Sequence, residues 1–175
     1  KVEVSKNGGG SWETIFGPRS GVVGLGWVQQ TVLLDETYAV AEFQIRFALT
    51  SDVTGAASGF YIDDLRIAAM GLTTADPARP TQDFEAGDGG FVVAGNASSW
   101  THGTPTSGPG AAHSGSNVWG TNLNGLYNAS ESSTLTSPSY DASGATGKTL
   151  VVSWWQFIET EKGYDQVKVE VSKDA

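Results

Sequence analysis

The sequence predicts an all-β protein, a jelly-roll-type antiparallel β-sandwich, from three observations. The 175 residues include 23 glycines, which supply turns, together with six tryptophans, seven phenylalanines and five tyrosines, which supply bulky core side chains. Several short segments alternate apolar and polar residues with the period of two that is typical of half-buried strands. No convincing helix pattern is present, and strands at short spacing with turn residues between them favour a sandwich or a jelly roll.

Seven segments carry the strand pattern most clearly. Residues 1–6, KVEVSK, alternate cleanly, and the Asn-Gly-Gly-Gly that follows at 7–10 predicts a hairpin turn. Trp154 and Trp155 are adjacent in the most apolar strand and must face opposite sides of its sheet. One belongs in the core, and packing under a loop or a neighbouring subunit is favoured for the other over stacking on a sugar. The expected strands are 1–6, 12–16, 27–34, 42–50, 60–67, 148–157 and 166–173.

The strand expected at 60–67 changes phase within its length. Phe60 and Ile62 point to one side, and after Asp63-Asp64 the apolar positions are Leu65 and Ile67. A slip of this kind predicts a β-bulge, which re-aims the side chains beside it. We therefore expect Asp63 and Asp64 to occupy a bulge.

The chain divides into two blocks with a repeated strand. Residues 73–82, TTADPARPTQ, carry two prolines and no apolar period, and they predict a linker between a closing half at 1–72 and an opening half at 83–175. The hexapeptide KVEVSK occurs at 1–6 and again at 168–173, so that one strand position appears twice, as in a window cut from a tandem array. The sandwich is then either one domain in permuted order or one completed by a neighbouring repeat or subunit.

Segments of both blocks resemble a known family. They are DFEAGDGGF (83–91), AHSGSNVWGTNLNGLYN (112–128), LTSPSYD (135–141) and WWQFIETEKGYDQVKVEVSKD (154–174) in the second block, and KVEVSKNGGGSWETI (1–15), FQIRFALTSD (43–52) and GFYIDDLRI (59–67) in the first. The chain resembles the MAM-like jelly-roll domains of secreted bacterial peptidases of the immune inhibitor A and bacillopeptidase F type, with the two halves in rotated order. The resemblance implies a two-sheet sandwich, an extracellular or cell-surface location, and a non-catalytic role in adhesion, assembly or ligand binding.

Composition excludes several classes of function. The formal net charge of −9 argues against a nucleic-acid partner, which requires a Lys/Arg surface. The absence of cysteine excludes disulfides, thiol catalysis and cysteine-based zinc sites. No apolar run approaches ~20 residues, so we expect no membrane insertion.

The best candidate site is acidic. Two carboxylate clusters, one ending the first block and one opening the second, resemble the calcium site of such modules, and Ca²⁺ prefers hard oxygen ligands. The alternative is that these acids are solvated turn residues, which Asp favours. The candidate ligands are Asp63, Asp64, Asp83, Glu85 and Asp88. A weaker group is formed by Glu159, Glu161 and Asp165, for which a solvated loop is favoured.

The remaining polar candidates indicate little chemistry. His102 and His113 are the only histidines, and both lie in Gly/Ser/Thr-rich segments that favour exposed loops. No nucleophile elbow, HExxH or Walker-type sequence is present, so we expect no enzymatic activity. Three residues, Trp119, Asn122 and Asn124, could line a polar groove, although a structural loop is favoured for them.

The function we expect is that of a structural or adhesive repeat module that assembles with copies of itself into an extracellular array or filament. Glu3 or Glu170, and Lys168 or Lys173, would then lie on outward faces between units. The alternatives are a carbohydrate-binding module with a polysaccharide partner and an accessory domain of a secreted peptidase.

Overall fold

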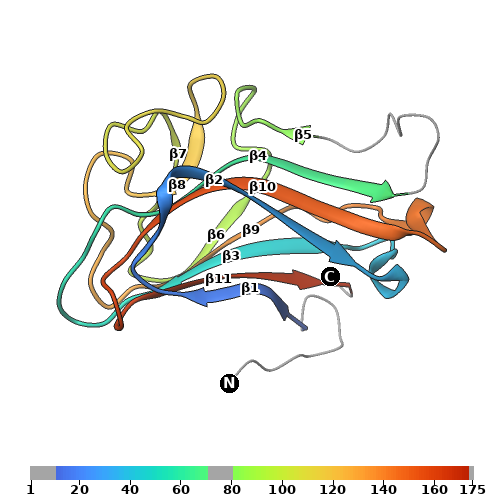
Figure 1. Cartoon of the computed structure of the whole chain (residues 1–175), viewed down its shortest axis with the longest axis horizontal. Coiled ribbons are helices and arrows are strands. Elements are labelled where there is room, and N and C mark those ends of the chain that lie inside the picture. Colours follow the sequence, from blue (N-terminus) through green and yellow to red (C-terminus); the bar gives the residue numbers. More distant parts are fainter. Residues whose placement is uncertain (1–10, 71–80, 174–175) are drawn as a thin grey trace.

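The computed structural model describes residues 11–70 and 81–173, and in them two antiparallel β-sheets face each other (Figure 1). The first sheet has the order β1 (Glu13–Arg19), β11 (Gln166–Ser172), β3 (Gln44–Thr50), β9 (Ser132–Thr136) and β6 (Val92–Asn96). The second has the order β2 (Val22–Leu34), β10 (Thr149–Glu159), β4 (Gly59–Met70), β8 (Val118–Thr121) and β7 (Trp100–Gly103), and short β5 (Thr81–Gln82) pairs with β4. The predicted strand at 1–6 and all but the last two residues of the predicted linker lie outside the described residues.

The predicted all-β sandwich is confirmed. Most successive strands pass from one sheet to the other, as in a jelly roll, and the consecutive pairs β4–β5 and β7–β8 stay within the second sheet. The helical segments among the described residues are two 3-10 turns at Glu36–Tyr38 and Ser143–Ala145. No helix in the described part of the chain is long and apolar enough to cross a membrane.

The core lies between the sheets and is built by alternation along each strand. In β10, Leu150, Val152 and Trp154 are fully buried. The ring of Trp154 meets that of Phe47 edge to face at a centroid distance of 5.8 Å, and Phe47 meets Phe60 at 5.9 Å. Edge-to-face rings add to the burial of their apolar area, so these aromatic residues hold the two sheets together.

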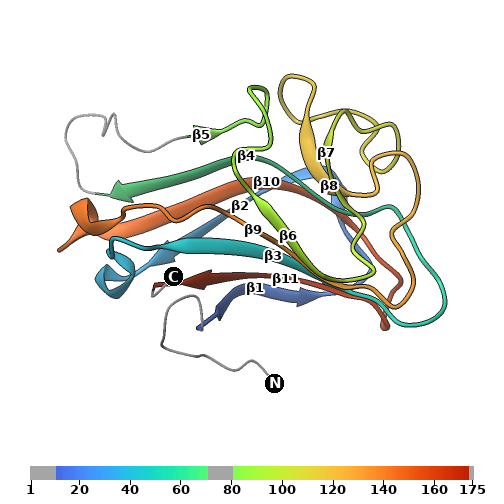
Figure 2. The same ribbon diagram turned by 180° about the vertical axis from the view of Figure 1, so that it is seen from behind.

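The two sequence blocks interleave strand by strand. In the first sheet β1 and β3 flank β11, and in the second β2 and β4 flank β10, so that β10 and β11 each lie between two strands from the first block, while the other second-block strands extend the sheets beyond β3 and β4. The two views in Figures 1 and 2 show β11 lying between β1 and β3. In the described fold β1 of the same chain pairs with β11. Neither block can form either sheet by itself.

The bulge predicted at Asp63-Asp64 is confirmed. Along the β10–β4 ladder Ser153 pairs with Arg66 and Trp155 pairs with Asp63, so β4 carries one residue more than β10 over this interval. Asp64 has a φ of 48°, the left-handed value that bulged residues adopt. The bulge lets β4 keep apolar residues inward on both sides of it.

Strand boundaries differ from the prediction mainly in β2. The strand begins at Val22 rather than at residue 27. Its first residues also pair with β10, across a register shift between Gln156 and Ile158 that accommodates extra residues in β2. Gly24 and Gly26 have φ values of 82° and 92°, and glycine adopts these without strain.

Candidate functional site

The bulge in β4 places two carboxylates against the loop between β7 and β8. Asp63 is fully buried, and its Oδ2 accepts hydrogen bonds from the backbone N–H of His113 at 2.9 Å and of Ser114 at 3.1 Å. Burial raises the pKa of Asp63 to about 6, although the hydrogen bonds that its carboxylate accepts oppose the shift. The side chain therefore anchors the loop at a cost in desolvation.

Asp64 and Trp155 hold the side chain of His113. The Nδ1 atom of His113 lies 2.6 Å from Oδ2 of Asp64, and the Ser114 hydroxyl donates to Oδ1 of Asp64 at 2.9 Å. The imidazole stacks on Trp155 with ring centroids 3.7 Å apart and an interplanar angle of 14°. Trp27 meets the imidazole edge to face and donates its indole N–H to the carbonyl of Ala111 at 3.1 Å. Trp155 thus packs under a loop, as favoured from the sequence.

The prediction that both histidines are exposed loop residues is wrong. His113 is half-buried between Asp64 and Trp155. His102 lies on β7, also half-buried, with Nε2 at 2.8 Å from the carbonyl oxygen of Phe84 and its ring against Phe84 and Trp119. Each imidazole therefore fills a packing position that a Gly/Ser/Thr-rich sequence context does not reveal.

Glu85 holds the same β7–β8 loop from a second side. Its Oε1 accepts hydrogen bonds from the backbone N–H of Ser116 at 2.9 Å and of Asn117 at 2.7 Å, and these bonds lower the pKa of its carboxyl group. The loop at Gly115 has a φ of 59°, and a Cβ there would lie 2.3 Å from the Glu85 carboxyl carbon. A side chain at position 115 would therefore displace the Glu85 carboxylate from its present position, and the positive φ would strain it as well.

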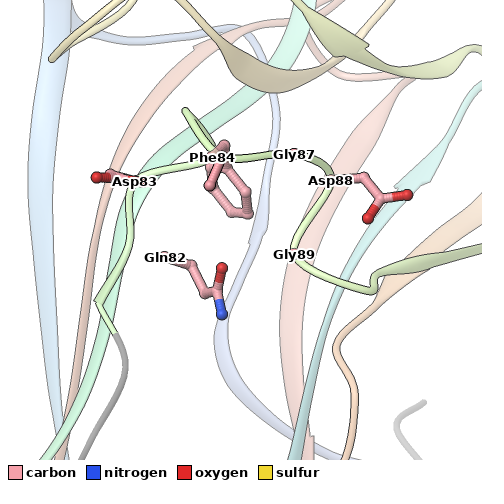
Figure 3. A pocket seen from close by; sticks show the side chains of 7 residues that line it. Gln82, Asp83, Phe84, Gly87, Asp88 and Gly89 are labelled. Atoms are coloured by element: carbon pink, nitrogen blue, oxygen red, sulfur yellow. The ribbon is translucent and has the colours of Figure 1, made fainter.

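Asp83 and Asp88 make local turns. Asp83 accepts from the backbone N–H of Glu85 at 3.2 Å, and Asp88 from that of Gly90 at 2.9 Å. Both line a small pocket with Gln82 and Phe84, and Figure 3 shows their carboxylates pointing away from each other. Each is the Asx-type turn expected from the alternative interpretation of these acids.

The five predicted metal ligands therefore do not converge on one point. Asp63 and Asp64 form a group with His113 in which the ligand atoms lie within 4.8 Å of one another, and Glu85 faces the same loop. Asp83 and Asp88 belong to no such group among the described residues. The arrangement clamps residues 113–117 by carboxylates on two sides.

A second carboxylate group lies at one end of the sandwich, between the β3–β4 loop and the β10–β11 hairpin, and it brings Asp52 to Glu161 and Asp165. Glu159, which was expected in this group, instead accepts a hydrogen bond from the Ser58 hydroxyl. The expectation of a solvated loop is wrong for Asp165, which is fully buried. Asp52 was not anticipated, although it follows the strand expected at 42–50 as Glu161 follows the one at 148–157, so both stand at strand ends.

The residues considered for a polar groove do not line one: Trp119 lies on β8, and Asn122 and Asn124 lie in the structural loop that follows it. Trp119 is buried and donates its indole N–H to the carbonyl of Asp88 at 2.9 Å. Asn122 has a φ of 62° and donates its side-chain amide to the carbonyl of Leu126 at 2.6 Å. Asn124 is exposed in the turn between Asn122 and Leu126.

Comparison with known proteins gives one informative similarity. An 88-residue stretch, 50% of this chain, is 38% identical to bacillopeptidase F of Bacillus subtilis. The chain covers 6% of the length of that protein. No family model matches the chain, and no solved structure matches it. Half of this β-sandwich is thus similar to a small part of a much longer peptidase.

Proposed function

We propose that this chain is a non-catalytic accessory module, of the MAM-like jelly-roll type, within a longer extracellular protein. The observation that carries the proposal is the similarity to bacillopeptidase F, which spans half of this chain but 6% of the peptidase. The non-catalytic role is supported by the partners of the two histidines, which are Asp64 and the carbonyl of Phe84, because neither of these contacts joins an imidazole to a hydroxyl nucleophile. The Ser114 hydroxyl bonds to Asp64 and not to an imidazole.

The test is to express residues 1–175 and to measure hydrolysis of casein and of fluorogenic peptides. The proposal predicts a folded protein with no hydrolysis above buffer. Hydrolysis that disappears in the His113→Ala or His102→Ala variant, with the fold retained by circular dichroism, would contradict it.

We also propose that Ca²⁺ contributes to the first acidic group. Asp63, Asp64 and Glu85 gather around one loop, and a bound cation would offset the repulsion between their carboxylates. Ca²⁺ that binds the native state preferentially raises the melting temperature, and removal by a chelator lowers it. An increment from Ca²⁺ that is unchanged in the Asp64→Asn and Glu85→Gln variants would exclude this group as the source.

A second candidate function is that of a repeat unit in an array or filament of such modules. The duplicated hexapeptide KVEVSK at 1–6 and 168–173 favours it, because both copies have the sequence that pairs with β1 and β3 in the described fold. If strands are exchanged between copies, the chain forms oligomers that deletion of residues 1–6 abolishes. A chain that remains monomeric over a wide concentration range by light scattering would contradict the exchange.

The carbohydrate-binding alternative has weaker support. The face of Trp155 that was considered for sugar stacking is covered by the His113 ring. Tyr164 is the exposed aromatic residue that remains in the described part of the chain, with 66% of its surface accessible. A polysaccharide that binds the wild-type chain and not the Tyr164→Ala variant would revive this alternative.

A further inference from the structure

The second carboxylate group is assembled from three separate connections of the chain. Asp52 comes from the β3–β4 loop, Glu161 and Asp165 come from the β10–β11 hairpin, and Tyr127 comes from the β8–β9 connection. The ligand oxygens of the three acids all lie within 4.8 Å of one another. In Figures 1 and 2 the β3–β4 loop and the β10–β11 hairpin lie together at one end of the sandwich.

Hydrogen bonds fix two of the three acids in place. Asp165 is fully buried, and its Oδ1 accepts from the backbone N–H of Asp52 at 2.8 Å, while its Oδ2 accepts from the hydroxyl of Tyr127. The Tyr127 oxygen in turn accepts from the backbone N–H of Glu161 at 3.0 Å. One oxygen of Asp52 accepts from the backbone N–H of Thr54 at 2.8 Å. The group is therefore ordered without any cationic side chain among these contacts.

The carboxylate of Glu161 has one oxygen without a hydrogen-bond donor among the described residues. Its Oε2 is shielded from solvent and accepts no hydrogen bond from any described residue. The backbone at Gly55 shields it, because a Cβ at that position would lie 1.9 Å from Oε2. A buried carboxylate oxygen without a donor costs free energy unless a proton or a cation satisfies it.

The charges around Glu161 do not supply that compensation. Desolvation raises the pKa of the Glu161 carboxyl group, and the negative charges of Asp52 and Asp165 raise it further. Oxygens that bind a common Ca²⁺ at about 2.3–2.6 Å are at most roughly 5 Å apart, which agrees with the spacing of the three acids. Three carboxylates on ordered loops are a suitable oxygen donor set for this ion.

We propose that Asp52, Glu161 and Asp165 form a Ca²⁺ site that joins the β3–β4 loop to the β10–β11 hairpin, with Oε2 of Glu161 as one ligand. The site is separate from the Asp63–Asp64–Glu85 group and does not depend on the accessory function proposed above. Bound Ca²⁺ replaces repulsion among three carboxylates with attraction, and it ties together two connections that lie far apart in the sequence.

The test is a calorimetric titration of the chelator-treated chain with CaCl₂, combined with thermal unfolding in chelator and in excess Ca²⁺. We expect saturating Ca²⁺ to raise the melting temperature of the wild-type chain by about 5 °C or more. The Glu161→Gln and Asp52→Asn variants should lose that increment and one binding event. In chelator, Glu161→Gln should melt at or above the wild-type temperature, because it removes one of three mutually repelling charges.

The control is Glu159→Gln, which makes the same change two residues away, at a carboxylate bonded to Ser58 and outside the group. It should keep both the binding event and the thermal increment. Ca²⁺ binding that survives in Glu161→Gln and Asp52→Asn but disappears in Asp64→Asn would assign the ion to the first group and overturn this site. No binding by the wild-type chain would overturn it as well, with a proton on Glu161 as the remaining compensation.

Discussion

Glu170 is a buried carboxylate that forms ion pairs with Arg46 and Lys168. It lies on β11 with 2% of its side chain exposed, and its carboxylate accepts from Arg46 Nε and Lys168 Nζ, each at 2.7 Å. The Arg46 guanidinium also lies 4.2 Å above the ring of Trp12. Glu170 and Lys168 were expected on faces between units, but their charges are paired within one chain. Burial raises the pKa of Glu170, and the bonds from Arg46 and Lys168 outweigh this effect and lower it.

Replacing Glu170 by Gln should reduce the free energy of unfolding at about pH 7 by roughly 1–2 kcal/mol, because the charge is buried while its partners reach solvent. A carboxyl group with a folded pKa below its usual value of 4.5 stabilises the fold above that value and loses the effect as the pH falls. The difference between wild type and Glu170→Gln in urea unfolding should therefore shrink between about pH 5 and about pH 3. A difference that grows toward acid would refute the ion-pair account, and exposed Glu42→Gln is the control.

The side of the sheet that a residue faces was predictable where the two-residue period of the strand alone determines it. The opposite facing of Trp154 and Trp155 follows from adjacency, and the structure has Trp154 in the core and Trp155 under His113. The roles of His113 and Asp165 were not predictable, because their burial comes from segments about 50 residues away or more, such as Asp64 and Asp52. Contacts of that separation leave no local pattern.

At the scale of elements, the bulge in β4 has the largest consequence. It allows Phe60 and Ile62 before it, and Leu65 and Ile67 after it, to face the same core. It also turns Asp63 and Asp64 toward the β7–β8 loop. A phase slip between two apolar pairs was enough to predict the bulge, but the sequence does not identify the loop that it holds.

Deletion of Asp64 should abolish cooperative folding or cost more than about 4 kcal/mol. Without the extra residue one half of β4 must shift by one position, which turns either its first or its second apolar pair to the outside. Asp64→Asn is the matched control, since it keeps the residue count, keeps a side-chain oxygen for the Ser114 hydroxyl and tolerates the positive φ, and it should stay within roughly 1 kcal/mol of wild type. Equal stability of the two variants in urea unfolding would show that the bulge does not set the register.

Strands β6 to β9 could not be located individually from the sequence. They are four or five residues long, and β6 has every residue exposed, so that no apolar alternation marks it. The long strands β3, β4 and β10 were found because each buries one complete face in the core. Burial on one face is thus the physical origin of the signal: the exposed edge strand β6 lacks it, and β7, β8 and β9 are too short to show a clear period.

At the scale of the whole molecule, the two blocks of the sequence form one sandwich by alternating across both sheets. Neither block forms a sheet alone, because β10 and β11 each pair with a first-block strand on both sides. Whether copies of the chain exchange these halves stays a prediction. The central claim is that one chain supplies both blocks of its own sandwich.

A cysteine pair tests this claim most directly, because the chain contains no cysteine of its own. Thr31 of β2 and Ser153 of β10 are directly opposite in the antiparallel ladder, one from each block, and opposite pairs have Cβ atoms within about 4.5–5.5 Å. A chain carrying Thr31→Cys and Ser153→Cys should, after oxidation, form a disulfide within one chain and run as a monomer on a non-reducing gel. The control pair Thr31→Cys and Ser132→Cys, on different sheets, should form no internal bond. Disulfide-linked dimers or ladders from the Thr31–Ser153 pair would contradict the account, because they would show that the two blocks of a sandwich come from different chains.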